Sequence, residues 1–172
     1  MMADTGIMEL FNKLGDFTGI GGSYKYELMV YPDLDIGVIN GDMNRDRVAA
    51  AVGEILANEY VRKVSVVDTI NFDLSKRPKP KGYWVGIEIP YANDDWGIDC
   101  WLQQPDWVES SEDPYANKLE ALGEAEKDLI LAIKYDLIYL GLYGKRYFSS
   151  DVYDSVLGGG VRSVDDFYKI WK

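Results

Sequence analysis

The feature that most constrains this chain is a pair of aspartates, Asp33 and Asp35, in an apolar segment that follows the turn residues Gly22 and Ser23. Apolar and polar residues alternate over residues 33–39, which is typical of a strand with one buried face, so both carboxylates project from the other face. Two like charges side by side repel, and a divalent cation removes this repulsion while leaving room for water and phosphate oxygens. Backbone N–H groups and the hydroxyl at Gly22 and Ser23 suit a phosphate. The segment therefore predicts a metal beside a phosphate, which is the chemistry of phosphoryl or nucleotidyl transfer.

These residues resemble the signature of the nucleotidyltransferase superfamily related to DNA polymerase beta, in its small-molecule and antibiotic-modifying branch. That signature is a hydrophobic residue, Gly, then Gly or Ser, a gap of about nine to thirteen residues, and Asp-hydrophobic-Asp/Glu-hydrophobic. The chain matches it over residues 22–36, with Gly21 in place of the leading hydrophobic residue. The resemblance implies an α+β fold in which helices pack on a small mixed β-sheet. It also implies two Mg²⁺ ions held by Asp33 and Asp35, a nucleoside triphosphate as co-substrate, and phosphate contacts at Gly22 and Ser23.

The resemblance further implies a third carboxylate on a neighbouring strand, which binds the metal next to the acceptor oxygen and takes its proton. Asp99 is the first candidate, because a carboxylate inside the apolar stretch 97–102 is costly without a ligand or partner. Glu88 competes, because it shares a face of the preceding predicted strand with Trp84 and Gly86. In minimal members of the superfamily this acid falls in the strand directly after the helix, where the chain offers Asp68 or Ser65, and a serine would be a poor metal ligand. The predicted catalytic and metal-binding residues are Asp33, Asp35 and Asp99.

The charge balance and the rare residue types narrow the partners. A net charge of −11 disfavours a nucleic-acid acceptor, because such binding depends on neutralising phosphates with Lys and Arg. The chain has no histidine, which excludes His-based triads, His general bases and His-containing zinc sites. The single Cys100 excludes an internal disulfide and fits a reducing cytoplasm. No apolar run is long enough to span a membrane, so we expect neither membrane nor nucleic-acid partners. Self-association stays open.

Hydrophobic periodicity and turn residues predict a core over residues 1–110 and a helical extension over 111–172, packed on the same domain. The predicted helices are 7–14, a helical turn within 24–29, 45–60 capped by Asn44, 115–142, 150–157 and 163–171. The predicted strands are 33–39, 61–70, 83–89 and 96–102, with turns at 19–23 and 92–95. Lys134 is expected to be an ordinary surface lysine of the long helix, and the basic run 76–81 a solvated loop.

Together these features predict a metal-dependent nucleotidyltransferase. It would move a nucleoside monophosphate from a nucleoside triphosphate, with ATP the expected donor, to a hydroxyl group of a small molecule. The alternative is a catalytically silent protein of the same fold that serves as a binding or regulatory module, in the manner of an antitoxin. Intact Asp33 and Asp35 favour the enzyme, because a silent protein has no evident need for two adjacent charges.

Overall fold

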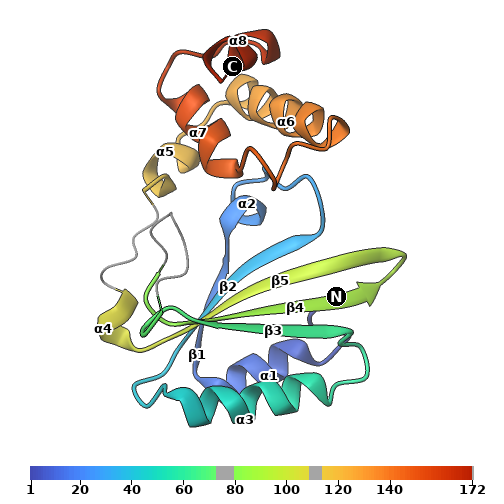
Figure 1. Ribbon diagram of the computed structural model, residues 1–172, viewed down its shortest axis with the longest axis vertical. Coiled ribbons are helices and arrows are strands. Elements are labelled where there is room, and N and C mark those ends of the chain that lie inside the picture. Colours follow the sequence, from blue (N-terminus) through green and yellow to red (C-terminus); the bar gives the residue numbers. More distant parts are fainter. Residues whose placement is uncertain (73–79, 109–113, 172) are drawn as a thin grey trace. The chain divides into compact units, whose positions relative to one another are not determined.

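The computed structural model describes residues 1–72, 80–108 and 114–171, and most of the basic run 76–81 lies outside this range. The chain has a mixed α+β fold with a five-stranded mixed open sheet (Figure 1), which confirms the predicted fold class at that level. The strands are β1 (Asp16–Gly21), β2 (Asp33–Ile39), β3 (Lys63–Asp68), β4 (Tyr83–Tyr91) and β5 (Asp94–Gln103). The helices are α1 (Ile7–Leu14), α2 (Gly22–Lys25), α3 (Arg45–Leu56), α4 (Pro105–Val108), α5 (Ala116–Glu120), α6 (Glu124–Tyr139), α7 (Ser149–Leu157) and α8 (Val164–Ile170).

The strand order in the sheet is β1-β2-β5-β4-β3. Strands β2 and β5 are parallel, and the other neighbouring pairs are antiparallel. Strand β1 was not predicted, because Gly19 and Gly21 indicated a turn over residues 19–23. The segment instead pairs with β2, and its register shifts between Phe17 and Ile20, where the glycine-containing stretch forms an irregularity.

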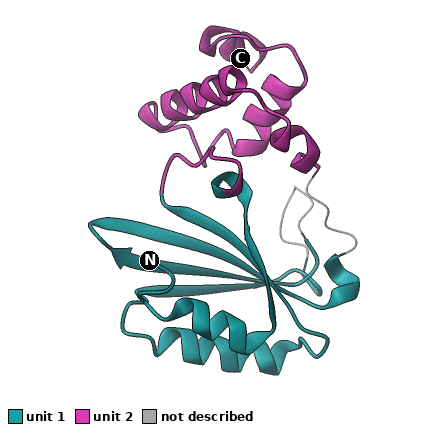
Figure 2. Ribbon diagram, turned by 180° about the vertical axis from the view of Figure 1, so that it is seen from behind, with its two compact units in different colours: residues 1–24, 32–112 teal, residues 25–31, 113–172 magenta. Residues whose placement is uncertain are grey.

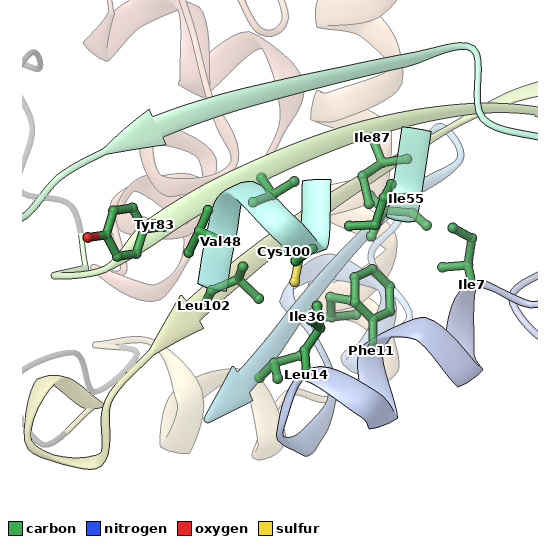
Figure 3. Close-up of a cluster of buried hydrophobic side chains, with 14 of the residues drawn as sticks. Ile7, Phe11, Leu14, Ile36, Val48, Ile55, Tyr83, Ile87, Cys100 and Leu102 are labelled. Carbon is green, nitrogen blue, oxygen red and sulfur yellow. The ribbon is translucent and has the colours of Figure 1, made fainter. Parts of the chain in front are cut away.

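Alternation along the strands directs the apolar side chains of β2, β4 and β5 to one face of the sheet. Figure 1 shows α1 and α3 lying together against this face, and Figure 3 shows the side chains that meet there. The labelled core residues are Ile7, Phe11, Leu14, Ile36, Val48, Ile55, Tyr83, Ile87, Cys100 and Leu102. Because neighbouring strand residues point to opposite faces, Asp33 and Asp35 project away from this core.

Helix α3 begins where the sequence predicted. The Asn44 side chain accepts a hydrogen bond from the backbone N–H of Arg47 at 3.0 Å, which confirms Asn44 as the N-cap. The helix ends at Leu56, four residues earlier than the predicted boundary at residue 60. The turn between β4 and β5 is confirmed but is shorter than predicted. Tyr91 pairs with Asp94, and only Ala92 and Asn93 lie between them, with φ values of 52° and 72°.

The chain divides into two compact units, coloured separately in Figure 2. Unit 1 comprises residues 1–24 and 32–112, and contains the sheet with α1 and α3. Unit 2 comprises residues 25–31 and 113–172, so a short segment from the first part of the chain belongs with the later helices. Unit 2 has a hydrophobic core of its own, which includes Leu28, Ile133 and Phe167. Within the described part of the chain, no helix is long and apolar enough to cross a membrane.

The long helix predicted over residues 115–142 is wrong. The structure instead has α5, a break at residues 121–123, and α6. Gly123 is extended, with φ −79° and ψ 162°, and its N–H donates to the Glu126 carboxylate at 3.1 Å. This contact starts a new helix at Glu124, because a carboxylate in the first turn satisfies an N–H that the helix cannot.

The expectation that Lys134 lies on the surface is also wrong. Its side chain is fully buried in the core of unit 2. The Nζ atom donates hydrogen bonds to the carbonyl oxygen of Leu28 at 2.9 Å and to the hydroxyl of Tyr153 at 3.0 Å. A buried ammonium group requires such partners, because burying it without hydrogen bonds would be very costly.

Candidate functional site

The predicted acids are brought together by the parallel pairing of β2 and β5. Asp35 lies directly opposite Asp99 in this pairing, and Asp33 lies opposite Gly97. Residues paired in register point to the same face of a sheet, and adjacent strands lie about 4.8 Å apart. Three carboxylates therefore occupy one small area of the face that is turned away from α1 and α3. Ile98 and Cys100, the residues on either side of Asp99, are buried on the core side.

Glycines beside the acids leave space for the carboxylates. A Cβ atom at Gly97 would lie 2.8 Å from an oxygen of Asp33, which is too close for an unstrained contact. A Cβ atom at Gly22 would overlap the carboxylate of Asp35, and Gly22 has a positive φ of 59°. Only glycine meets both requirements at position 22 without strain.

The turn at Gly22 and Ser23, which is predicted to bind phosphate, therefore lies directly against Asp35. Gly21 is the β1 residue paired with Asp35, and the chain leaves the sheet at the next residue. Gly22 and Ser23 are the first two residues of α2, a single helical turn. The contact between Gly22 and Asp35 is the geometric basis for treating these two segments as one site. Phosphate binding at Gly22 and Ser23 stays a prediction.

Crowding of negative charge shifts the ionisation of Asp33. Burial is the largest cause, and the charges of Asp99 and Asp35 add to it, raising the pKa of Asp33 from 3.8 to about 7. All three causes disfavour the ionised carboxylate. Asp33 therefore holds a proton over much of the acidic range, and a cation placed at this cluster would favour its release.

Glu88, the competing third acid, is engaged elsewhere. Its carboxylate forms ion pairs with Lys63 at 2.7 Å and with Arg62 at 3.2 Å. Hydrogen bonding to Lys63, followed by that to Arg62, lowers the pKa of Glu88. In the sheet Glu88 lies opposite Gly97 from the β4 side, so β5 separates it from the strand of Asp33. The placement favours Asp99 as the neighbour of Asp33 and Asp35.

Ser65 and Asp68, the positions that minimal members of the superfamily would use for the third acid, lie on β3 at the far edge of the sheet. Strands β4 and β5 both stand between β3 and β2. Burial alone would raise the pKa of Asp68, but hydrogen bonds from Asn71 and Arg45 lower it to about 2. Asp68 is thus a stable carboxylate whose partners lie away from the acid pair.

The donor chemistry of the cluster fits Mg²⁺, which prefers oxygen ligands and keeps several waters. Asp33, Asp35 and Asp99 are the residues that could hold such an ion. Over the described ranges of the chain, no three His, Cys, Asp or Glu side chains converge closely enough to form a ready-made metal site. As placed, the carboxylates share one face and interact through their charges.

Gly97 is the site residue that the sequence reasoning missed. It shares a face with Asp99 on β5, and its missing side chain leaves space for an oxygen of Asp33. The signal was present, because a glycine within a strand often marks a place where another group approaches the backbone closely.

Comparisons with known proteins add no relative: no protein-family model matches the chain, and neither a curated protein nor a solved structure matches it. The interpretation of the site therefore depends on its residues and their geometry.

Proposed function

We propose that this chain is a metal-dependent nucleotidyltransferase with an open mixed sheet of the nucleotidyltransferase type. It transfers a nucleoside monophosphate from a nucleoside triphosphate, with ATP the expected donor, to a hydroxyl of a small-molecule acceptor. The observation that carries the proposal is the register of β2 and β5, which puts Asp35 opposite Asp99 and leaves Asp33 beside both charges. The contact of Gly22 with Asp35 adds a phosphate-compatible turn at the same place.

In this proposal each residue has a separate task. Asp33 and Asp35 would hold two Mg²⁺ ions, which would bind the triphosphate. Asp99 would complete the acceptor side, where its carboxylate would bind metal and accept the proton of the attacking hydroxyl. Backbone N–H groups at Gly22 and the hydroxyl of Ser23 orient phosphate oxygens. When bound, Mg²⁺ would neutralise the negative charge that develops on the leaving pyrophosphate. The protein contributes mainly position and electrostatic complementarity.

The raised pKa of Asp33 gives this proposal a pH signature. A metal ion binds the deprotonated carboxylate, so binding must displace the proton that Asp33 holds below about pH 7. The affinity for Mg²⁺ with ATP should therefore rise as the pH increases through about 7 and then level off. Calorimetry in buffers of different ionisation enthalpy should detect the protons that binding releases.

Nucleotide binding with and without Mg²⁺ tests the proposal directly. At a hundredfold excess over Kd, ATP with Mg²⁺ should stabilise the folded protein by about 2.7 kcal/mol, which raises the melting temperature by roughly 5–10 °C. Asp35→Asn should abolish the Mg²⁺-dependent part, and Asp94→Asn, an exposed acid at the start of β5, is the matched control. If ATP, GTP, CTP and UTP all leave the melting temperature unchanged in Mg²⁺, the proposal fails.

A pyrophosphate-release assay separates the enzyme from a silent binding module. An enzyme should release pyrophosphate when a hydroxyl-bearing acceptor is supplied, and Asp99→Asn should remove this release while triphosphate binding persists. Mg²⁺-dependent binding without pyrophosphate release for any acceptor would favour the binding or regulatory module instead.

A further inference from the structure

The segment between the two halves of the candidate site belongs to a different compact unit. Ser23 and Asp33 lie in unit 1, whereas residues 25–31, which connect them along the chain, belong to unit 2. Leu28 lies at the middle of this connection, five residues from Ser23 and five from Asp33. What holds Leu28 therefore limits the freedom of both site residues through the chain itself.

Leu28 is held by the buried lysine of α6. The Leu28 side chain is fully buried in the core of unit 2. The Leu28 carbonyl oxygen accepts a hydrogen bond from Lys134 Nζ at 2.9 Å. The same Nζ donates to the Tyr153 hydroxyl and lies 4.8 Å from the centroid of the Tyr153 ring. It lies 5.9 Å from the Tyr143 ring centroid. A hydrogen bond from an ammonium group to a buried carbonyl is stronger than one between neutral groups.

Two ion pairs hold the part of the segment that precedes Leu28. Lys25 Nζ lies 2.6 Å from a carboxylate oxygen of Glu120, and Glu27 pairs with Lys127. Glu27 also has a positive φ of 62°, a conformation that a non-glycine residue adopts only when its surroundings favour it. Contacts to α5 and α6 thus fix this part of the segment.

We propose that Lys134 is a positioning residue for the candidate site. By holding the carbonyl of Leu28, it anchors the connection whose two ends carry Ser23 and Asp33, and so restricts the spacing of the phosphate-binding turn and the acid pair. The proposal rests on the proposed function for the identity of the ligand, MgATP. The anchoring itself does not depend on that function. Loss of the anchor lengthens the effective loop between the two site elements and weakens their preorganisation.

Lys134→Met tests the anchor, because methionine keeps much of the length of the side chain and removes the ammonium donor. The matched control is Lys145→Met, at an exposed lysine of the same unit. Hydrogen exchange should become faster in residues 20–36 of Lys134→Met and stay unchanged in β4. The affinity for MgATP should fall by about tenfold or more, since small misplacements of reacting groups have large effects. Lys145→Met should match the wild type in both measurements.

If Lys134→Met fails to fold, a charge-reversal series at Glu27 and Lys127 tests whether anchoring residues 25–31 positions the candidate site. Glu27→Lys and Lys127→Glu each place like charges together, and the double variant restores an opposite pair. Both single variants should accelerate exchange over residues 20–36 and weaken MgATP binding about two- to fivefold, and the double variant should regain most of each loss.

Two results would overturn the proposal. One is a folded Lys134→Met protein with wild-type exchange over residues 20–36 and wild-type MgATP affinity. The other is a charge-reversal series in which the double variant is no better than the singles. If the wild type itself does not bind MgATP, the proposed function fails, while the hydrogen-exchange comparison still tests the anchor.

Discussion

Replacing Asp33 by asparagine should make unit 1 more stable at neutral and alkaline pH. The folded state raises the pKa of this carboxyl from 3.8 to about 7, so between these values the folded protein binds more protons than the unfolded chain. The stability that the protonated Asp33 carboxyl contributes to the folded state is therefore fully present below pH 3.8. It is lost as the pH rises through about 7. The amide of the Asp33→Asn variant resembles the protonated acid, so the variant keeps that contribution at every pH.

The size of the effect follows from the shift. A change of about 3 pKa units corresponds to about 4 kcal/mol at 1.36 kcal/mol per unit. Asp33 is partly exposed, so solvent screening reduces this to about 2 kcal/mol. Asp33→Asn should thus raise the free energy of unfolding by about 2 kcal/mol at pH 8 and change it little at pH 4.

Tryptophan fluorescence during urea unfolding is a suitable assay, because it reports mainly on unit 1. The tryptophans of unit 1 are Trp84, Trp96, Trp101 and Trp107, and Trp171 lies in unit 2. A Trp171→Phe background removes the signal from unit 2. The difference in free energy of unfolding between the parent protein and its Asp33→Asn variant is measured from pH 4 to pH 8, with Asp94→Asn as the control. A difference that does not change with pH, or an Asp33→Asn variant that is less stable than its parent at pH 8, would refute the reasoning.

Three further predictions follow from single contacts. Gly22→Ala should destabilise unit 1 by about 1–3 kcal/mol in urea unfolding, because position 22 has a positive φ and a Cβ atom there overlaps Asp35; wild-type stability would contradict this geometry. Asn44→Ala should cost about 1 kcal/mol, since it leaves the N–H of Arg47 without its cap, whereas Asn44→Asp should retain most of the stability. Burial raises the pKa of Cys100 far above its usual range, so a thiol reagent should modify it only at the rate of unfolding, and fast labelling of native protein would exclude this placement.

The strands of the sheet were largely predictable because their burial alternates with period two. This pattern located β2, β4 and β5 to within a few residues. Strand β1 was missed because Gly19 and Gly21 have no side chains and so interrupt the alternation of apolar and polar residues. Pairing with β2 stabilises it as an edge strand, and that is a long-range contact that no local pattern reveals.

The site was predictable in its residues but not in its assembly. Alternation within each strand indicates which face Asp99 or Glu88 occupies, yet it does not say which strand lies beside β2. The parallel pairing of β5 with β2 decides this, and it joins strands that are far apart in the sequence. An order with β4 beside β2 would have put Glu88 nearer to Asp35 without changing any local pattern.

Lys134 and residues 25–31 show a second limit. A lysine on an amphipathic helix is normally exposed to solvent, and nothing in the helix sequence distinguishes a buried lysine from an exposed one. Its partners, the Leu28 carbonyl and the Tyr153 hydroxyl, come from distant parts of the sequence. Only the fold of unit 2 brings them together, so its boundary at residues 25–31 could not be predicted from composition.

The Asp33 carboxylate opposes the stability of the fold that carries it. Burial and the charges of Asp99 and Asp35 raise the pKa of Asp33, whereas hydrogen bonds from Lys63 and Arg62 lower the pKa of Glu88, and hydrogen bonds from Asn71 and Arg45 lower that of Asp68. The carboxylates of Glu88 and Asp68 are thus stabilised by hydrogen-bond donors, whereas the Asp33 carboxylate is destabilised by its surroundings. Such departures from local consistency are expected where a residue serves a function rather than the fold. If Asp33→Asn stabilises unit 1 and also removes MgATP binding, the same charge accounts for both effects, and the cluster is better explained as a cation site than as a surface feature.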